Sequence, residues 1–186
     1  NSNFIDNYVE GNEESNGGAI WSNSDILITA DNGTSLFDGN KVNGESNAIY
    51  MQGTPEQGCS DCEEYTPEER VNLNLSAVNN GTITFNDAID GNIYNINVYG
   101  DGTGVVKFNN LVKNVTNFTL GANSITHLGL NSKVYAQNMN ISTSAIPGGN
   151  AVSSPIITVD VEVDKANNTI NTGQIFVYND IAGDYR

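Results

Sequence analysis

The stretch that decides the fold runs from Asn72 to Val98 and reads NLNLSAVNNGTITFNDAIDGNIYNINV. Polar and apolar residues alternate in its first four residues, 72–75, and again in its last four, 95–98, which begin 23 positions further on. Alternation with a period of two is typical of a β-strand that buries one face. Between these segments, Asn79-Asn80-Gly81 predicts a turn, because Asn and Gly tolerate a positive φ. The stretch therefore predicts one unit of a strand-and-turn repeat.

The alternating segment recurs along the chain. Copies begin at residues 72, 95, 117, 138 and 160, which are 23, 22, 21 and 22 residues apart, and weaker copies lie at 25–28 and 47–50. A repeat of this length with short strands and no helical pattern is typical of a β solenoid. Leucine-rich repeats are disfavoured because the chain lacks their Leu spacing, and a β-sandwich is the alternative. We expect an all-β, single-stranded parallel β-helix over residues 1–186, cut from a longer chain, with about eight coils of about 22 residues.

The register of the repeat predicts which side chains face the core. The apolar member of each alternating pair should point inward, and so should alternate residues of a second, shorter strand in the coil. The predicted inward residues are Leu73, Leu75, Ile96, Val98, Phe118, Leu120, Met139, Ile141, Val161 and Val163, with Ile83, Phe85, Val106 and Phe108 on the second strand. Equivalent residues of successive coils should then stack about 4.8 Å apart in apolar rows.

Composition and charge exclude several classes of partner. The chain of 186 residues carries 7 Lys+Arg against 22 Asp+Glu, a formal net charge of −15. Nucleic-acid binding and attachment to an anionic membrane both need clustered Lys and Arg, so we expect neither. The sequence contains no run of 18 apolar residues and no signal peptide at its start, so we expect no membrane insertion of this segment. The 31 Asn and 19 Gly favour strands joined by turns.

An insertion of about residues 52–70 interrupts the repeat. Its two cysteines, Cys59 and Cys62, are most consistent with a small disulfide at the loop tip, while free or redox thiols and a metal site are the alternatives. Its acidic residues include weak candidates for calcium ligands, because Ca²⁺ prefers carboxylate oxygens. These candidates are Glu56, Asp61, Glu63 and Glu64. Their spacing fits no EF-hand loop, so a solvated acidic loop is the alternative and no cofactor is otherwise expected.

No set of residues predicts catalysis. His127 is the single histidine, and its strand context favours a surface position over a general base. The two arginines, Arg70 and Arg186, lie far from the repeat's carboxylates, and the GxSxG motif is absent. The segment 100–104, GDGTG, is similar to a calcium-binding repeat but occurs once, so a plain turn is favoured. We therefore expect no catalytic residues and a protein that is not an enzyme.

Two short motifs occur twice near the N-terminus. Phe4-Ile5-Asp6-Asn7 is followed by Gly17-Gly18-Ala19-Ile20, and Phe37-Asp38-Gly39-Asn40 by Ser46-Asn47-Ala48-Ile49. They resemble the FxxN and GGAI repeats of polymorphic outer-membrane proteins, which are autotransporter adhesins, although the second copy has Ser-Asn in place of Gly-Gly. The resemblance implies a right-handed parallel β-helix, exported through a bacterial outer membrane and displayed on the cell surface. It places the translocator barrel outside these 186 residues.

The leading hypothesis is a non-enzymatic structural or adhesin stalk of an autotransporter-like protein. Its expected partner is a host or matrix protein, or a glycan, with the 52–70 loop as the first contact point. The alternative is a carbohydrate-binding or carbohydrate-cleaving β-helix, such as a polysaccharide lyase, a hydrolase or a tailspike-like protein. That alternative needs exposed aromatic residues along one face. The candidates are Trp21, Tyr50, Tyr65, Tyr94, Tyr99 and Tyr135, whose positions in the repeat differ.

Overall fold

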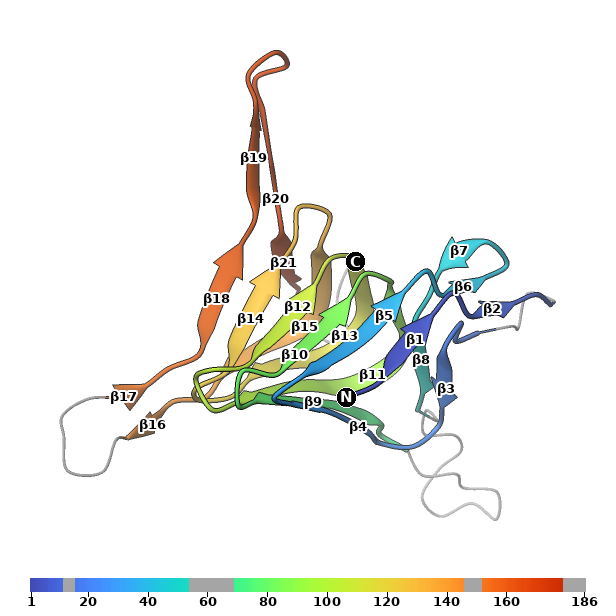
Figure 1. Cartoon of the computed structure of the whole chain (residues 1–186), viewed down its shortest axis with the longest axis horizontal. Helices are drawn as coiled ribbons and strands as arrows, with labels where there is room; N and C mark the ends of the chain where they lie inside the picture. The colour runs from blue at the N-terminus through green and yellow to red at the C-terminus, as the bar shows by residue number, and fades with distance from the viewer. Residues whose placement is uncertain (12–15, 54–68, 146–151, 179–186) are drawn as a thin grey trace, which may run out of the picture.

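The computed structural model describes residues 1–11, 16–53, 69–145 and 152–178. These residues form 21 strands and no helix, so the all-β prediction is confirmed (Figure 1). Two parallel sheets carry most of the chain. Successive side chains of a strand point to opposite faces, so polar–apolar alternation gives each strand one apolar face that is buried when the strands form a sheet.

The first sheet has six strands, all parallel. In spatial order they are β1 (Asn3–Ile5), β5 (Thr34–Asp38), β10 (Thr82–Phe85), β12 (Val105–Phe108), β14 (Ile125–Leu128) and β18 (Ile156–Val159). This sheet contains the short second strand that the sequence predicts after each turn.

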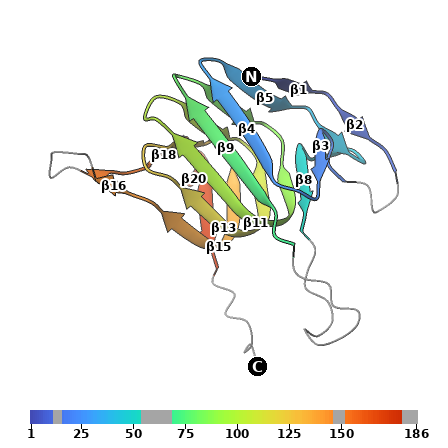
Figure 2. The same ribbon diagram turned by 90° about the horizontal axis from the view of Figure 1, so that it is seen from below.

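The second sheet has eight strands, also parallel. They are β3 (Ile20–Ser22), β4 (Ile26–Asp31), β8 (Ile49–Gln52), β9 (Asn72–Val78), β11 (Ile89–Gly100), β13 (Leu111–Leu120), β15 (Lys133–Ile141) and β21 (Gln174–Val177). The long strand β11 pairs with β8 through its first half and with β9 through its second half. Figure 2 shows β4, β9, β11, β13 and β15 side by side.

The chain alternates between the two sheets, and each passage pairs with the next one in both of them. We call one passage a level, and the described residues contain six levels. This arrangement is compatible with the expected β-helix, but it has fewer levels than the eight coils predicted. The reason is that levels differ in length. Equivalent residues lie 33, 48, 23 and 31 positions apart in different pairs of levels, because some levels carry hairpins or the insertion.

The core lies between the two sheets and contains a row of phenylalanines. The rings of Phe4, Phe37, Phe85 and Phe108 stack with centroid separations of 4.7, 4.8 and 5.6 Å. These separations follow the spacing of neighbouring strands, so the same residue type at one register position forms a continuous stack. Phe108 then meets Phe118 of the second sheet edge to face at 5.8 Å.

Ten of the predicted inward residues are buried, which confirms the register over the central levels. They are Leu73, Leu75, Ile83, Phe85, Ile96, Val98, Val106, Phe108, Phe118 and Leu120. The FxxN and GGAI motifs are also in register with their second copies. Asn7 Nδ2 donates to Asn40 Oδ1 at 2.7 Å, and the Gly18 N–H donates to the Asn47 carbonyl oxygen at 3.0 Å.

The predicted inward positions are wrong at the C-terminal end. Met139 is only partly buried and Ile141 is 59% exposed. Strand β21 pairs only with residues 133–136 of β15, so among the described residues no strand covers the second half of β15. Val161 and Val163 are exposed as well, because β19 (Val161–Asp164) pairs antiparallel with β20 (Thr169–Thr172). Alternation with a period of two suits such a hairpin as well as it suits a stacked strand.

Short strands form projections beyond the two sheets. They are β2 (Tyr8–Val9), β6 (Lys41–Val42), β7 (Glu45–Ser46), β16 (Ser144–Ala145) and β17 (Val152–Ser153). Figure 1 shows that the β19–β20 hairpin also projects away from both sheets.

The insertion leaves the second sheet at the point in the middle of β11 where its register against β13 shifts and its partner changes from β8 to β9, which we call the bend. Gln52 pairs with Asn92 and Asn72 pairs with Asn95, so the insertion takes the place of only two residues, 93–94, of the next level. The Gly53 N–H donates to the Asn92 carbonyl oxygen at 3.4 Å. Residues 54–68 lie outside the described residues, and with them the predicted disulfide of Cys59 and Cys62 and the calcium candidates Glu56, Asp61, Glu63 and Glu64.

Asparagine ladders join the levels on the outer surface. At the bend of the second sheet, each amide donates to the residue one level earlier, with separations of 3.0, 2.6, 2.9 and 3.2 Å. This ladder consists of Asp25, Asn72, Asn95, Asn117 and Asn138. An Asn side chain both donates and accepts, so stacked copies satisfy one another. Part of the high Asn content therefore serves to join neighbouring levels.

Candidate binding surface

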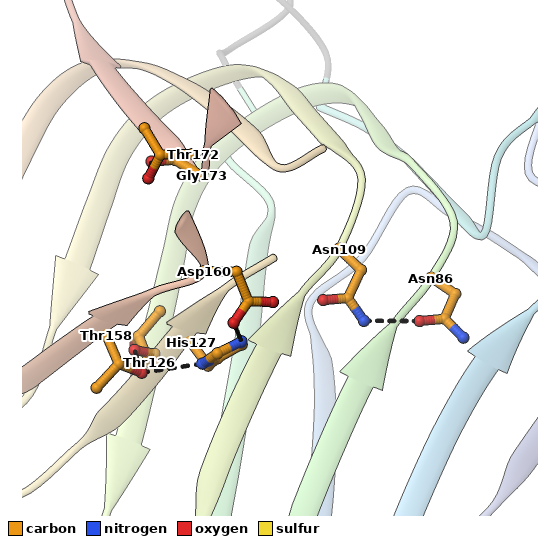
Figure 3. Close-up of polar contacts among 8 residues, drawn as sticks. All are labelled: Asn86, Asn109, Thr126, His127, Thr158, Asp160, Thr172 and Gly173. Carbon is orange, nitrogen blue, oxygen red and sulfur yellow. Dashed lines mark hydrogen bonds and ion pairs between the residues drawn. The ribbon is translucent and has the colours of Figure 1, made fainter. Parts of the chain in front are cut away.

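The single histidine lies on the outer face of the first sheet, as the sequence predicts. His127 Nε2 lies 3.2 Å from Asp160 Oδ1, and its Nδ1 lies 3.0 Å from Thr158 Oγ1 (Figure 3). A hydroxyl, an imidazole and a carboxylate in contact are the components of a nucleophilic triad. The Thr158 hydroxyl also lies 3.5 Å from the Thr126 carbonyl oxygen, so it contacts both the imidazole and the backbone of the neighbouring level. These contacts support a surface network that joins neighbouring levels.

A buried carboxylate lies at the turn between the two sheets. Asp87 is 6% exposed, and its carboxylate accepts hydrogen bonds from Asn40 N at 2.9 Å, Asn40 Nδ2 at 2.7 Å and Ser46 Oγ at 3.2 Å. A buried acid is often functional, but all these donors belong to the level beneath it. Asp87 therefore holds the turn of the second FxxN motif, because a buried charge is tolerated when it is fully hydrogen-bonded.

We expect Asp87→Ala to lower the free energy of unfolding by about 2–4 kcal/mol, because it leaves the buried Asn40 donors without an acceptor. The measurement is urea unfolding. The control is Asp31→Ala, because Asp31 is exposed and its carboxylate accepts from Asn79 Nδ2 at 2.8 Å at the surface. Equal stability of the two variants would contradict the structural role of Asp87.

The GDGTG segment forms a turn around Asp101. Its carboxylate accepts from Asn79 N at 2.7 Å, Thr103 Oγ1 at 2.7 Å, Thr103 N at 2.9 Å and Gly104 N at 3.3 Å. These donors, first of all the Asn79 N–H, hold the pKa of Asp101 well below its ordinary value of 3.8. The carboxylate oxygens are engaged by the turn and by the previous level, which supports the plain-turn interpretation over a calcium site.

Asp101→Asn should lower the free energy of unfolding at neutral pH and change how that free energy depends on pH. Because folding lowers this pKa, the unfolded chain binds the proton more readily, so the contribution of Asp101 is present above pH 3.8 and is lost as the pH falls. We therefore expect the stability difference between the native chain and Asp101→Asn to shrink from neutral pH to about pH 3. Urea unfolding across this range tests it. A difference that does not vary with pH would refute the role of the carboxylate charge.

One line of outward side chains runs along the first half of the second sheet, across all six levels. We call it the outer column, and it consists of Trp21, Tyr50, Asp90, Lys113, Tyr135 and Phe176. Each member directly follows, in the sequence, a residue that faces the core. The strand pairing of that preceding residue fixes the level at which the member lies. The outer column therefore has two aromatic residues at each end and an acid and a base in the middle.

Two contacts within the outer column are well defined. Lys113 Nζ and Asp90 Oδ2 form an ion pair at 2.8 Å, in which Lys113 is the more exposed partner. The rings of Tyr135 and Phe176 stack with centroids 4.8 Å apart and planes inclined by 10°. Cross-strand pairs of this kind are expected where the same face of adjacent strands carries large side chains.

Three hollows border the outer column. One, of about 300 Å³, includes Glu45, Asn47, Asp90 and Lys113 in its lining, and another, of about 480 Å³, lies at the base of the β19–β20 hairpin beside Lys133. These two share Leu111, so they adjoin along one side of the outer column. A third, of about 310 Å³, is lined by polar residues after the bend. They include Asn92, Asn114, Gln137 and Tyr178.

The outer column corrects the expectation that the aromatic candidates differ in their positions. Trp21, Tyr50 and Tyr135 share one line, which also includes Phe176. Tyr99 lies on the second half of the sheet, Tyr94 packs on Arg70 with the guanidinium carbon 4.3 Å from the ring centroid, and Tyr65 lies outside the described residues. A repeat with a constant length of 22 residues assigns these aromatic residues to different positions, because the levels have unequal lengths. Aligning the apolar residue before each member would have revealed it.

No protein-family model matches the chain, and neither the curated proteins nor the solved structures compared with it give a match. Within the described ranges, no helix is long and apolar enough to cross a membrane. The same residues contain no group of three or more His, Cys, Asp or Glu side chains placed to hold a metal ion. The outer column and its hollows are therefore the candidate site, on geometry alone.

Proposed function

We propose that the chain is a right-handed, single-stranded parallel β-helix that acts as a rigid, non-enzymatic stalk. The observation that supports this most directly is the pairing of each level with the next in both parallel sheets. Stacked phenylalanines inside repeat the same contact over the first four levels, and the asparagine ladder outside joins the first five. In such a stack every level contacts only its neighbours, so stiffness accumulates along one axis.

The stalk is proposed to be displayed on a bacterial cell surface as part of an autotransporter-like protein. The repeated FxxN and GGAI motifs support this proposal, since their two copies stack directly on one another. The first copy of the motif has a glycine at position 18 because a larger residue would not fit there. An added Cβ atom would lie 2.4 Å from the Asn47 carbonyl oxygen. The net charge of −15 suits a solvated rod that repels its own copies.

Adhesion is the activity proposed for the stalk, with a host or matrix protein or a glycan as partner. The test has two parts. Protease treatment of intact source cells should release the chain if it is displayed, and beads coated with the purified chain should be retained on matrix proteins or glycans. Full protection of the chain in intact cells would contradict display, and beads that bind nothing would contradict adhesion.

The enzymatic alternative is tested by turnover. Glycoside hydrolysis needs two facing carboxylates, and a lyase needs a base beside its substrate's acidic carbon. In the hollow beside the outer column, the acids Glu45 and Asp90 lie near Lys113, whose charge Asp90 already pairs. We expect no release of reducing or unsaturated sugar ends from polysaccharides. Release that Asp90→Asn and Glu45→Gln abolish would overturn the non-enzymatic proposal.

A further inference from the structure

We propose that the outer column is a binding site for a neutral glycan strand that runs along the stacking direction of the levels. The inference rests on the proposed stalk and names the chemical class of its ligand. It starts from the coincidence of three features on one face of the second sheet. These are a line of aromatic rings, a central ion pair and bordering hollows whose linings include both polar and apolar side chains.

The aromatic ends of the outer column fit the apolar faces of sugar rings. Trp21 is 52% exposed and Phe176 is 39% exposed, and each lies beside a second aromatic residue on the neighbouring level. A pyranose ring carries C–H groups on its face, which pack on an aromatic ring as other apolar groups do. Rings placed at both ends of one line would support a chain of several sugars at two separate points.

The polar centre fits the hydroxyl groups at the rim of such a ligand. Hydroxyls both donate and accept, and the middle of the outer column offers a carboxylate and an ammonium group side by side. Asn47 lines the adjoining hollow, and its buried Oδ1 accepts no hydrogen bond from the described residues. That atom has almost no exposed surface, so the hollow offers a ligand only the outer part of the Asn47 side chain. On the other side, Asn92 and Gln137 add amides that can both donate and accept.

Charge favours a neutral glycan over an acidic one. The positive charge of Lys113 is paired with Asp90 at 2.8 Å, and Glu45 lies in the lining of the same hollow. The chain as a whole carries −15, which repels uronate and sulfate groups at low ionic strength. Lys133 borders the second hollow, but one base does not offset these acids.

The length of the outer column predicts a preference for longer ligands. Six levels have five spacings of about 4.8 Å, which gives a line of about 24 Å. A short oligosaccharide would contact only one aromatic end, whereas a longer one would reach both. Affinity should therefore rise with chain length until the ligand spans the line, since linked contacts act together.

Trp21 provides a built-in reporter for the test, because it is the only tryptophan and lies at one end of the outer column. Its fluorescence would be followed while neutral xylo-, gluco-, manno- and galacto-oligosaccharides of increasing length are added. We expect a saturable change for at least one series, with tighter binding for longer members. Tyr135→Ala should weaken binding about tenfold, since it removes one stacking ring.

Tyr99→Ala is the matched control, because Tyr99 is exposed on the same sheet but outside the outer column. Its affinity should stay within about twofold of the native chain. Tyr135→Phe keeps the ring and should retain binding, which separates a lost contact from a damaged fold. Calorimetry with Trp21→Phe checks that binding does not depend on the reporter itself.

Three outcomes would overturn the inference. They are no binding of any neutral series, tighter binding of polygalacturonate or a sulfated glycan than of neutral chains, and equal losses in Tyr135→Ala and Tyr99→Ala. In each case the displayed stalk would be judged separately by the protease release of the chain from intact cells, which does not depend on the glycan site. A chain that binds neutral glycans but is fully protected from protease in intact cells would instead contradict the displayed stalk and leave the site intact.

Discussion

Phe85→Ala is expected to lower the free energy of unfolding by about 3–5 kcal/mol. Phe85 is 1% exposed and lies in the middle of the phenylalanine row, with Phe37 at 4.8 Å on one side and Phe108 at 5.6 Å on the other. Truncation removes its own buried surface and leaves a cavity that two neighbouring rings face. Backbone ladders on both sides restrict collapse of that cavity, because each level is paired above and below.

Urea unfolding of the whole chain measures this loss. Tyr99→Ala is the control, because it deletes an exposed ring from the other sheet and should change stability by no more than about 0.5 kcal/mol. Phe85→Leu should lie between the two, since it retains part of the buried volume. A loss of less than about 1 kcal/mol in Phe85→Ala would mean that the row is not the core of the stack.

Gly91→Ala is the second substitution with a large expected effect, of about 3 kcal/mol or more. Gly91 has a φ of +134° and lies opposite Met51, at the bend where the register of β11 against β13 shifts. An added Cβ atom would lie 1.9 Å from the Met51 carbonyl oxygen. Backbone atoms of a paired strand cannot move aside, so the neighbouring level would have to separate.

Gly102→Ala is the matched control for Gly91→Ala. Gly102 has a φ of +88°, and an added Cβ atom would meet no atom within 4 Å. It should therefore show only the cost of a positive φ, about 1–2 kcal/mol. Thermal or urea unfolding of both variants gives the difference. Equal losses would mean that the contact with Met51 does not limit the packing of these levels.

The inner register could be predicted from sequence between residues 72 and 141, because this stretch carries no long insertion between its strands. Leu73, Ile96 and Phe118 therefore keep the predicted spacing and lie on one row. The prediction was wrong at Val161 and Val163, since strand alternation specifies a buried face but not the partner strand. The turn after Asp164, whose carboxylate accepts from Asn167 N and Nδ2, closes a local hairpin instead.

The candidate site could not be predicted in the same way. Trp21, Tyr50 and Tyr135 are present in the sequence as aromatic candidates, but they are separated by unequal stretches of chain. They share one line because the 52–70 insertion and the hairpins lie outside the paired strands of the levels. The ion pair of Asp90 and Lys113 at its centre joins two levels and has no signature in either one alone.

The sequence by itself determined the local conformation: strands with one apolar face, turns at Asn and Gly, and an Asp or Asn side chain at each ladder position. These follow from side-chain size, alternation and the positive φ that Asn79 and Asn80 adopt, all of which act within a few residues. Only the tertiary structure decided which segments became neighbours and hence how many levels stack, which strands turn back as hairpins and which aromatic residues share a line. The physical reason is that pairing between levels depends on hydrogen bonds and burial between residues 20 to 48 positions apart, and loops of very different length can close such contacts at similar cost.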